Sequence, residues 1–118
     1  MITIITSAKA PMPSLVLAVL FLAVTAIPVL AADPQIMISI KDHQFVPSEV
    51  PTPAGVKVEL IIKNEQSVNA EFESKVLHRE KVIQAGGQVS ISVGPLKPGT
   101  YEFFDDFHRA THGSLVVK

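Results

Sequence analysis

The sequence contains no cysteine, and this absence removes several kinds of chemistry at once. Disulfide bonds, on which many small exported domains depend, cannot form. A thiolate, which acts as a nucleophile and as a soft metal ligand in other proteins, is not available either. The fold must therefore be stabilised by packing, by a partner, or by a metal ion held through other donors.

The chain also lacks a strong excess of charge. Its 10 Lys and Arg residues nearly balance its 11 Asp and Glu residues, for a formal net charge of −1. The basic surface that nucleic-acid binding requires is not expected, and we predict no nucleic-acid partner. No serine–histidine–acid arrangement is recognisable, so the sequence does not indicate an enzyme.

A hydrophobic run near the N-terminus predicts export. Residues 15–30 (LVLAVLFLAVTAIPVL) carry no charge, Lys9 is the one charged side chain before them, and the small residues Ala31 and Ala32 follow. This order is typical of a secretory signal peptide. We expect residues 1–32 to be a signal peptide cleaved after Ala32, and residues 33–118 to be the exported domain, with no stable membrane insertion after cleavage.

An uncleaved membrane anchor is the alternative interpretation of this run. A spanning helix needs about 20 apolar residues, whereas this run is shorter and contains Pro28. The length therefore favours a signal peptide over an anchor.

The rest of the chain alternates between apolar and polar residues with a period of two, as strands do. Ile36, Ile38 and Ile40 show this pattern, and glycine and proline punctuate the sequence between such segments. The expected strands lie within residues 36–41, 45–50, 56–63, 70–73, 81–83, 88–93, 101–105 and 115–117. Residues 74–80 are ambiguous and could hold a short helical turn. About eight short strands and no long helix predict an all-β sandwich or barrel.

Several segments, in this order, resemble the cupredoxin family. They are FVP (residues 45–47), PAGV (53–56), LIIKN (60–64), KPGTYEFF (97–104) and GSLVV (113–117). Cupredoxins place a PGxYxFxC strand, a ligand loop and a final GxLxV strand where the last two segments lie. The resemblance implies a Greek-key, cupredoxin-like β-sandwich for residues 33–118.

The copper ligands of that family do not all carry over. The first histidine falls near Ala70, the cysteine at Asp105, the second histidine at His108, and the axial ligand near Thr111 or His112. A blue-copper centre needs a thiolate beside two imidazoles. The resemblance therefore implies the fold without a blue-copper site.

Acidic residues and histidines take the place of that site. Asp105 shares strand parity with Tyr101 and Phe103, so we expect it to point inward, where a carboxylate is costly unless it is paired or binds a cation. In the implied fold, Glu71 and Glu73 lie at the same end of the sandwich. Carboxylate and imidazole donors suit Cu(II), iron, zinc or manganese. The candidate metal ligands are Glu71, Glu73, Asp105, Asp106, His108 and His112.

Each candidate also has a structural interpretation. The carboxylate of Asp105 could accept backbone N–H groups. Arg109 could pair with Asp105 or Asp106, which would make the cluster an ion-pair network without metal. His43 and His78 are expected to lie on the surface, outside the metal site.

A subgroup resemblance suggests the biological setting. The segments AEFES (residues 70–74), REKVI (79–83) and GPL (94–96), with Leu77, resemble the EfeO-type cupredoxin-like domains of bacterial periplasmic iron-uptake systems. That resemblance implies a periplasmic location, a copper or iron ion as cofactor, and an iron permease or another iron-uptake component as partner. The competing interpretation is a degenerate sandwich without metal that acts as a structural or interaction module.

Overall fold

The computed structural model describes residues 2–4, 9–14, 16–28 and 31–118. The chain divides into two units, Met1–Leu30 and Ala31–Lys118. The described residues of the first unit are exposed and form neither helix nor strand, and Leu15, Val29 and Leu30 of the expected apolar run lie outside the described residues. No helix in the described part of the chain combines the length and the apolarity that crossing a membrane requires.

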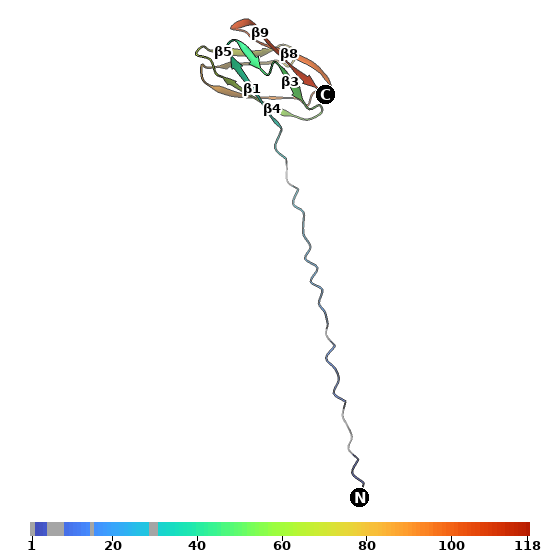
Figure 1. Ribbon diagram of the computed structural model, residues 1–118. Coiled ribbons are helices and arrows are strands. Elements are labelled where there is room, and N and C mark those ends of the chain that lie inside the picture. The colour runs from blue at the N-terminus through green and yellow to red at the C-terminus, as the bar shows by residue number, and fades with distance from the viewer. Residues whose placement is uncertain (1, 5–8, 15, 29–30) are drawn as a thin grey trace. The chain divides into compact units, whose positions relative to one another are not determined.

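Within the described residues, the second unit consists of nine strands and no helix (Figure 1). The strands are β1 (Gln35–Lys41), β2 (Gln44–Val46), β3 (Glu49–Thr52), β4 (Val58–Asn64), β5 (Ala70–Ser74), β6 (Arg79–Ile83), β7 (Gln88–Val93), β8 (Gly99–Asp105) and β9 (His108–Val117). Residues 75–78 form a turn between β5 and β6 rather than the short helical turn considered from the sequence.

The strands form two sheets that pack as a sandwich. One sheet has the order β2-β1-β4-β7 and the other has the order β3-β9-β8-β5-β6. Strand pairs β1–β4 and β3–β9 are parallel, whereas the remaining pairs are antiparallel. This arrangement confirms the predicted all-β, Greek-key sandwich.

The core lies between the sheets and follows the alternation of the sequence. Ile38 and Ile40 of β1 and Phe103 of β8 belong to one hydrophobic cluster, and all three are fully buried. The ring of Phe103 meets Phe45 edge-on at 4.8 Å and Phe72 at 5.0 Å between centroids. Burial of each such side chain stabilises the fold by about 1.5–3 kcal/mol.

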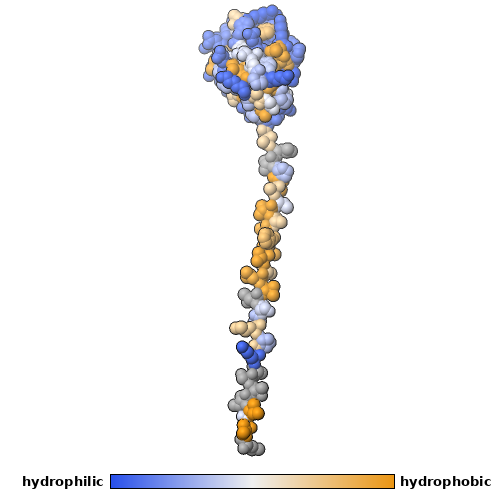
Figure 2. Space-filling view, turned by 90° about the vertical axis from the view of Figure 1, so that its right-hand side faces the viewer, coloured by the Kyte–Doolittle hydropathy of each residue, from blue (hydrophilic) through white to orange (hydrophobic). Residues whose placement is uncertain are grey.

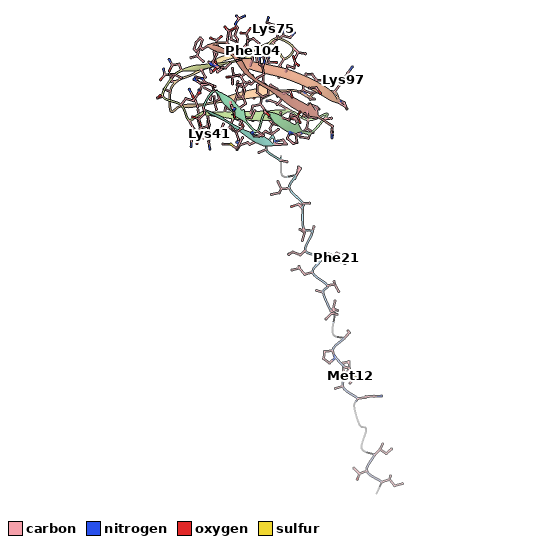
Figure 3. All side chains as sticks on the ribbon, turned by 45° about the horizontal axis from the view of Figure 1, so that its top comes forward. Met12, Phe21, Lys41, Lys75, Lys97 and Phe104 are labelled. Carbon is pink, nitrogen blue, oxygen red and sulfur yellow. The ribbon has the colours of Figure 1, made fainter. Side chains whose placement is uncertain are left out.

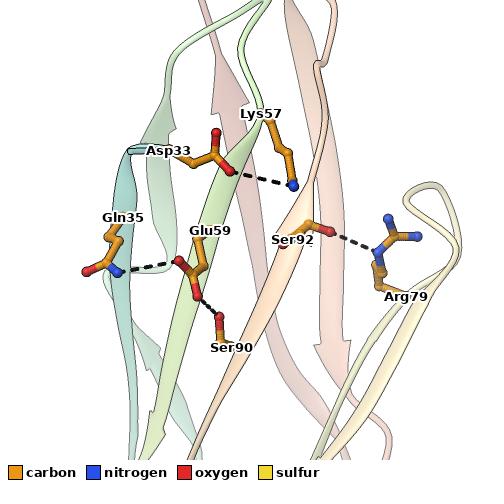
Figure 4. Close-up of polar contacts among 7 residues, drawn as sticks. All are labelled: Asp33, Gln35, Lys57, Glu59, Arg79, Ser90 and Ser92. Atoms are coloured by element: carbon orange, nitrogen blue, oxygen red, sulfur yellow. Dashed lines mark hydrogen bonds and ion pairs between the residues drawn. The ribbon is translucent and has the colours of Figure 1, made fainter. Parts of the chain in front are cut away.

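Polar contacts connect the strands on the outer face of the four-stranded sheet (Figure 4). Glu59 of β4 accepts hydrogen bonds from Gln35 of β1 and Ser90 of β7. Arg79 of β6 donates from Nε to the carbonyl oxygen of Ser92 in β7 at 3.0 Å, which joins the two sheets along one edge. Figure 2 shows that the surface of the sandwich on the viewed side is mainly hydrophilic, with separate hydrophobic spots.

The outer face of the five-stranded sheet carries the candidate site. Figure 3 shows Lys75 and Phe104 on that side of the sandwich and Lys41, from the four-stranded sheet, on the opposite side. The expected ligand loop after residue 105 is short, because β8 ends at Asp105 and β9 begins at His108.

A bulge interrupts the pairing of β8 with β9 next to this turn. The register changes from Phe104↔His112 to Asp105↔His108, so residues 109–111 have no opposite partner in β8. Such a bulge breaks the alternation of side chains between the two faces. It therefore separates histidines that the sequence predicts to lie together.

Candidate functional site

Three of the six predicted ligands come together on the outer face of the five-stranded sheet. Glu71 and Glu73 flank the inward-facing Phe72 in β5, so both carboxylates point away from the core. Asp106 lies in the turn after β8. One carboxylate oxygen from each of the three residues lies within 4.8 Å of the others. We call this group the carboxylate cluster.

Backbone contacts hold the turn against β5. The N–H of Asp106 donates to the carbonyl oxygen of Glu71 at 2.9 Å. In the reverse direction, the N–H of Glu71 donates to Oδ1 of Asp105, also at 2.9 Å. These two bonds fix the position of Asp106 relative to Glu71 and Glu73.

Asp105 is a positioning residue for the cluster. Its side chain points inward as predicted and is 1% exposed. Its Oδ1 accepts the N–H of Glu71 and, at 3.0 Å, the N–H of Phe107. The sequence left open whether Asp105 binds a metal, pairs with Arg109 or accepts backbone N–H groups. In the structure its carboxylate accepts backbone N–H groups.

Glu80 extends the carboxylate cluster and was missed from the sequence. It lies directly opposite Glu73 in the β5–β6 pair. A hydrogen bond to Glu80, burial, and repulsion by Glu80, Asp106 and Glu73 raise the pKa of Glu71 to about 7. Glu80 could have been predicted to lie here if residues 79–83 had been paired with β5 as a hairpin. The cluster therefore holds a proton near neutral pH at a position where a cation could replace it.

Arg109 approaches the cluster from β9. Its Nη2 lies 2.8 Å from Oδ1 of Asp106, and the guanidinium is largely exposed. This oxygen is buried, and the contact with Arg109 is an ion pair at the edge of the cluster. An exposed arginine of this kind is easily displaced, because such ion pairs contribute little in water.

The two predicted histidines lie apart from the carboxylate cluster. The ring of His108 stacks on that of His43, and its Nδ1 lies 2.8 Å from the hydroxyl of Thr111. His112 lies beside Phe104, with 6.2 Å between the ring centroids, and borders a hollow with Ser48. Among the described residues, neither histidine contributes a ring nitrogen to the set of ligand atoms that lie within 4.8 Å of one another.

The donors at the cupredoxin copper positions do not fit a blue-copper ion. Ala70 offers no donor, and Asp105 stands where a thiolate is needed and already accepts two backbone N–H groups. The hydroxyl of Thr111 donates to the carbonyl oxygen of His43. Blue-copper chemistry needs a thiolate with two imidazoles, so this sandwich does not contain such a centre.

The fold and this donor set define a class of protein, namely a cupredoxin-type β-sandwich without the thiolate of a blue-copper site. The family model described as the Cupredoxin-like domain matches residues 14–117, and the chain belongs to this family.

One curated relative is an uncharacterized protein of Rickettsia prowazekii (strain Madrid E). It is 45% identical over 83 residues, a match that covers 70% of this chain and 66% of the relative, slightly under two thirds of its length.

Two solved structures illustrate the likeness of fold. The metal-binding domain of the Streptococcus pneumoniae D39 Cu(I)-exporting P-type ATPase CopA, determined with Cu(I), has a TM-score of 0.65 and 19% identity over 71% of this chain and 84% of that domain. Amicyanin from Paracoccus versutus has a TM-score of 0.59 and 18% identity over 75% of this chain and 85% of amicyanin. At these identities the comparison establishes the fold.

Proposed function

We propose that this protein is a periplasmic metal-binding protein that holds ferric iron or Cu(II) at Glu71, Glu73 and Asp106 and assists iron uptake beside an iron permease. The observation that carries the proposal is the convergence of three carboxylate oxygens within 4.8 Å. The fold neighbours support metal handling, because CopA's domain was determined with Cu(I). The iron-uptake setting is supported by the EfeO-type resemblance of the sequence.

The donors favour ferric iron over Cu(II) within this proposal. The carboxylate cluster offers oxygen, and oxygen donors suit hard cations, whereas imidazole suits copper and zinc. Oδ1 of Asp106 is buried at the same place, where it faces the exposed guanidinium of Arg109. A cation bound there would satisfy this oxygen and relieve the repulsion among the carboxylates.

Metal content of the purified protein tests this function. The protein is loaded with Fe(III) citrate, Cu(II), Zn(II) or Mn(II), freed of unbound metal by gel filtration, and analysed for bound metal. We expect retention of iron, and we expect Glu73→Gln and Asp106→Asn each to weaken binding by roughly tenfold or more, about 1.4 kcal/mol. Glu102→Gln is the matched control, because Glu102 is an exposed carboxylate on the same face of the sheet.

The interaction-module alternative has its own supporting observation, the ion pair between Arg109 and Asp106. If the pair is the whole purpose of the cluster, the protein retains neither iron nor Mn(II), and Glu73→Gln and Asp106→Asn change the retention of none of the four metals. That result would contradict the metal-binding proposal and leave the module as the better account.

Export belongs to the same proposal and rests on the apolar run of residues 15–30. The expected cut after Ala32 lies close to the boundary between the two units of the chain. Mass spectrometry of periplasmic extracts should find a protein that begins at Asp33. A full-length chain recovered from the membrane fraction would show an anchor instead.

A further inference from the structure

Two histidines from different hairpins form a stacked pair beside the turn that carries Asp106. His43 lies in the connection between β1 and β2, and His108 begins β9. Their ring centroids are 4.0 Å apart with 16° between the planes. Both residues are exposed, so both rings can be reached from solvent.

The hydrogen bonds around Thr111 prepare one nitrogen of His108 as a ligand. The Thr111 hydroxyl has one hydrogen, which it donates to the carbonyl oxygen of His43 at 2.6 Å. In its 2.8 Å contact with Nδ1 of His108 the hydroxyl must therefore accept. Neutral His108 then carries its proton on Nδ1 and leaves the lone pair of Nε2 free. Metal-binding histidines usually donate their other ring N–H in this way.

His43 is held in place through both of its peptide groups. Its N–H donates to Oε1 of Gln66 at 2.8 Å, while its carbonyl oxygen accepts from Thr111. Gln66 is in turn anchored, because its Nε2 donates at 3.2 Å to Oδ1 of the fully buried Asn64. These contacts fix the backbone of His43 and leave its ring exposed.

The backbone at His43 is strained as well. Asp42 and His43 form a two-residue hairpin loop with φ angles of +47° and +56°. This conformation fits the loop but costs a non-glycine residue about 1–3 kcal/mol. The loop therefore fixes the backbone from which the His43 side chain projects.

From these contacts we propose that His43 and His108 form a second metal site, an exposed imidazole pair that binds Cu(II) or Zn(II) through ring nitrogens. Imidazole suits these borderline ions. The site differs in chemistry from the oxygen donors of the carboxylate cluster, and it stands or falls independently of the proposed function. Water completes the coordination of the ion.

Binding of one ion by both rings requires them to leave the stack. The lone pairs of parallel rings do not converge, so at least one ring rotates about its side-chain bonds into solvent. Thr111 holds the ring of His108 while His43 turns. Metal binding should therefore break the stacking of the two rings. The NMR signals of the rings report this change independently of the measured affinity.

The test is a titration of the purified protein with Cu(II), followed by electron paramagnetic resonance, and with Zn(II), followed by proton NMR of the histidine rings. We expect nitrogen couplings from two imidazoles with Cu(II), and Zn(II) shifts confined to His43 and His108. His43→Asn and His108→Gln should each reduce affinity by roughly tenfold or more, and Thr111→Val by about 10–100-fold through the lost orientation of the ring.

His78→Asn is the matched control for His43→Asn. His78 is also an exposed histidine in a turn, with a φ angle of +55°, and asparagine tolerates this conformation at both positions. We expect His78→Asn to leave the affinity unchanged. Equal losses in His78→Asn and His43→Asn, or two nitrogen couplings that persist in both His43→Asn and His108→Gln, would overturn the proposal.

Discussion

At the scale of single residues, Glu71 shows how the fold creates a site. Its pKa is raised from near 4.5 to about 7, first by the hydrogen bond to Glu80 and then by burial and neighbouring carboxylates. The folded protein therefore binds this proton more tightly than the unfolded chain. The stability that Glu71 contributes is fully present below about pH 4.5 and is lost as the pH rises to about 7.

Glu71→Gln tests this linkage. Glutamine keeps a donor toward Glu80 but carries no charge, so the metal-free variant should lose the decline in stability that the wild type shows between pH 5 and pH 8. The melting temperatures of both proteins, measured across this range in the presence of a chelator, should converge near pH 5 and separate at pH 8, with the variant higher. A parallel pH dependence in the two proteins would show that Glu71 is not the group responsible.

Asp105 is the second residue whose role can be isolated. Asp105→Ala leaves the N–H groups of Glu71 and Phe107 without their acceptor, which costs roughly 1–3 kcal/mol for the buried N–H of Glu71 and less for the partly buried N–H of Phe107. Asp105→Asn retains an oxygen that can accept both, so it should be destabilised less. Urea denaturation of the metal-free variants measures the difference. Equal stabilities of the alanine and asparagine variants would contradict the positioning role.

At the scale of elements, the β8–β9 hairpin depends on close packing at Gly113. A Cβ at this position would lie 2.5 Å from the ring of Phe103, which is fully buried and cannot move aside. We expect Gly113→Ala to destabilise the protein by about 1–3 kcal/mol through overpacking. Ser114→Ala, at the neighbouring residue on the opposite face of β9, is the control, and chemical denaturation checks both. A wild-type stability in Gly113→Ala would mean that the hairpin adjusts at no cost.

The elements also show what the sequence could predict. Alternation such as that of Ile36, Ile38 and Ile40 predicts strands because each strand has one buried face, and this reasoning located the sandwich and its core. The same reasoning correctly predicted that the side chain of Asp105 points inward. The bulge at residues 109–111 left no such pattern, because a bulge breaks the alternation. A loop was consequently expected where β9 begins, and His108 was expected to join Glu71, Glu73 and Asp106, whose carboxylate oxygens come together without it.

Contacts between distant segments could not be predicted from the sequence for a related reason. Glu80 and His43 reach their neighbours through the pairing of β5 with β6 and through the stack of two hairpin loops. Such contacts depend on register and turn geometry rather than on the local pattern. The expected mixed site therefore divides into an oxygen cluster and an imidazole pair, which share the short turn between Asp105 and His108.

At the scale of the whole molecule, metal binding and folding are linked. An ion that binds the folded state alone stabilises it by about 2.7 kcal/mol at a hundredfold excess over Kd. In a domain of this size, each kcal/mol raises the melting temperature by about 4–8 °C. Mn(II) is a suitable probe of the carboxylate cluster, since it prefers oxygen donors over imidazole.

We expect Mn(II) to raise the melting temperature strongly at pH 8 and weakly at pH 5. The reason is that the ion must displace the proton of Glu71, whose pKa is about 7, and the proton is held firmly at the lower pH. Asp106→Asn should remove most of the rise at pH 8, whereas His43→Asn should preserve it, because the imidazole pair takes no part in binding Mn(II). A rise of the same size at both pH values, or one that survives Asp106→Asn, would place the bound ion outside the carboxylate cluster.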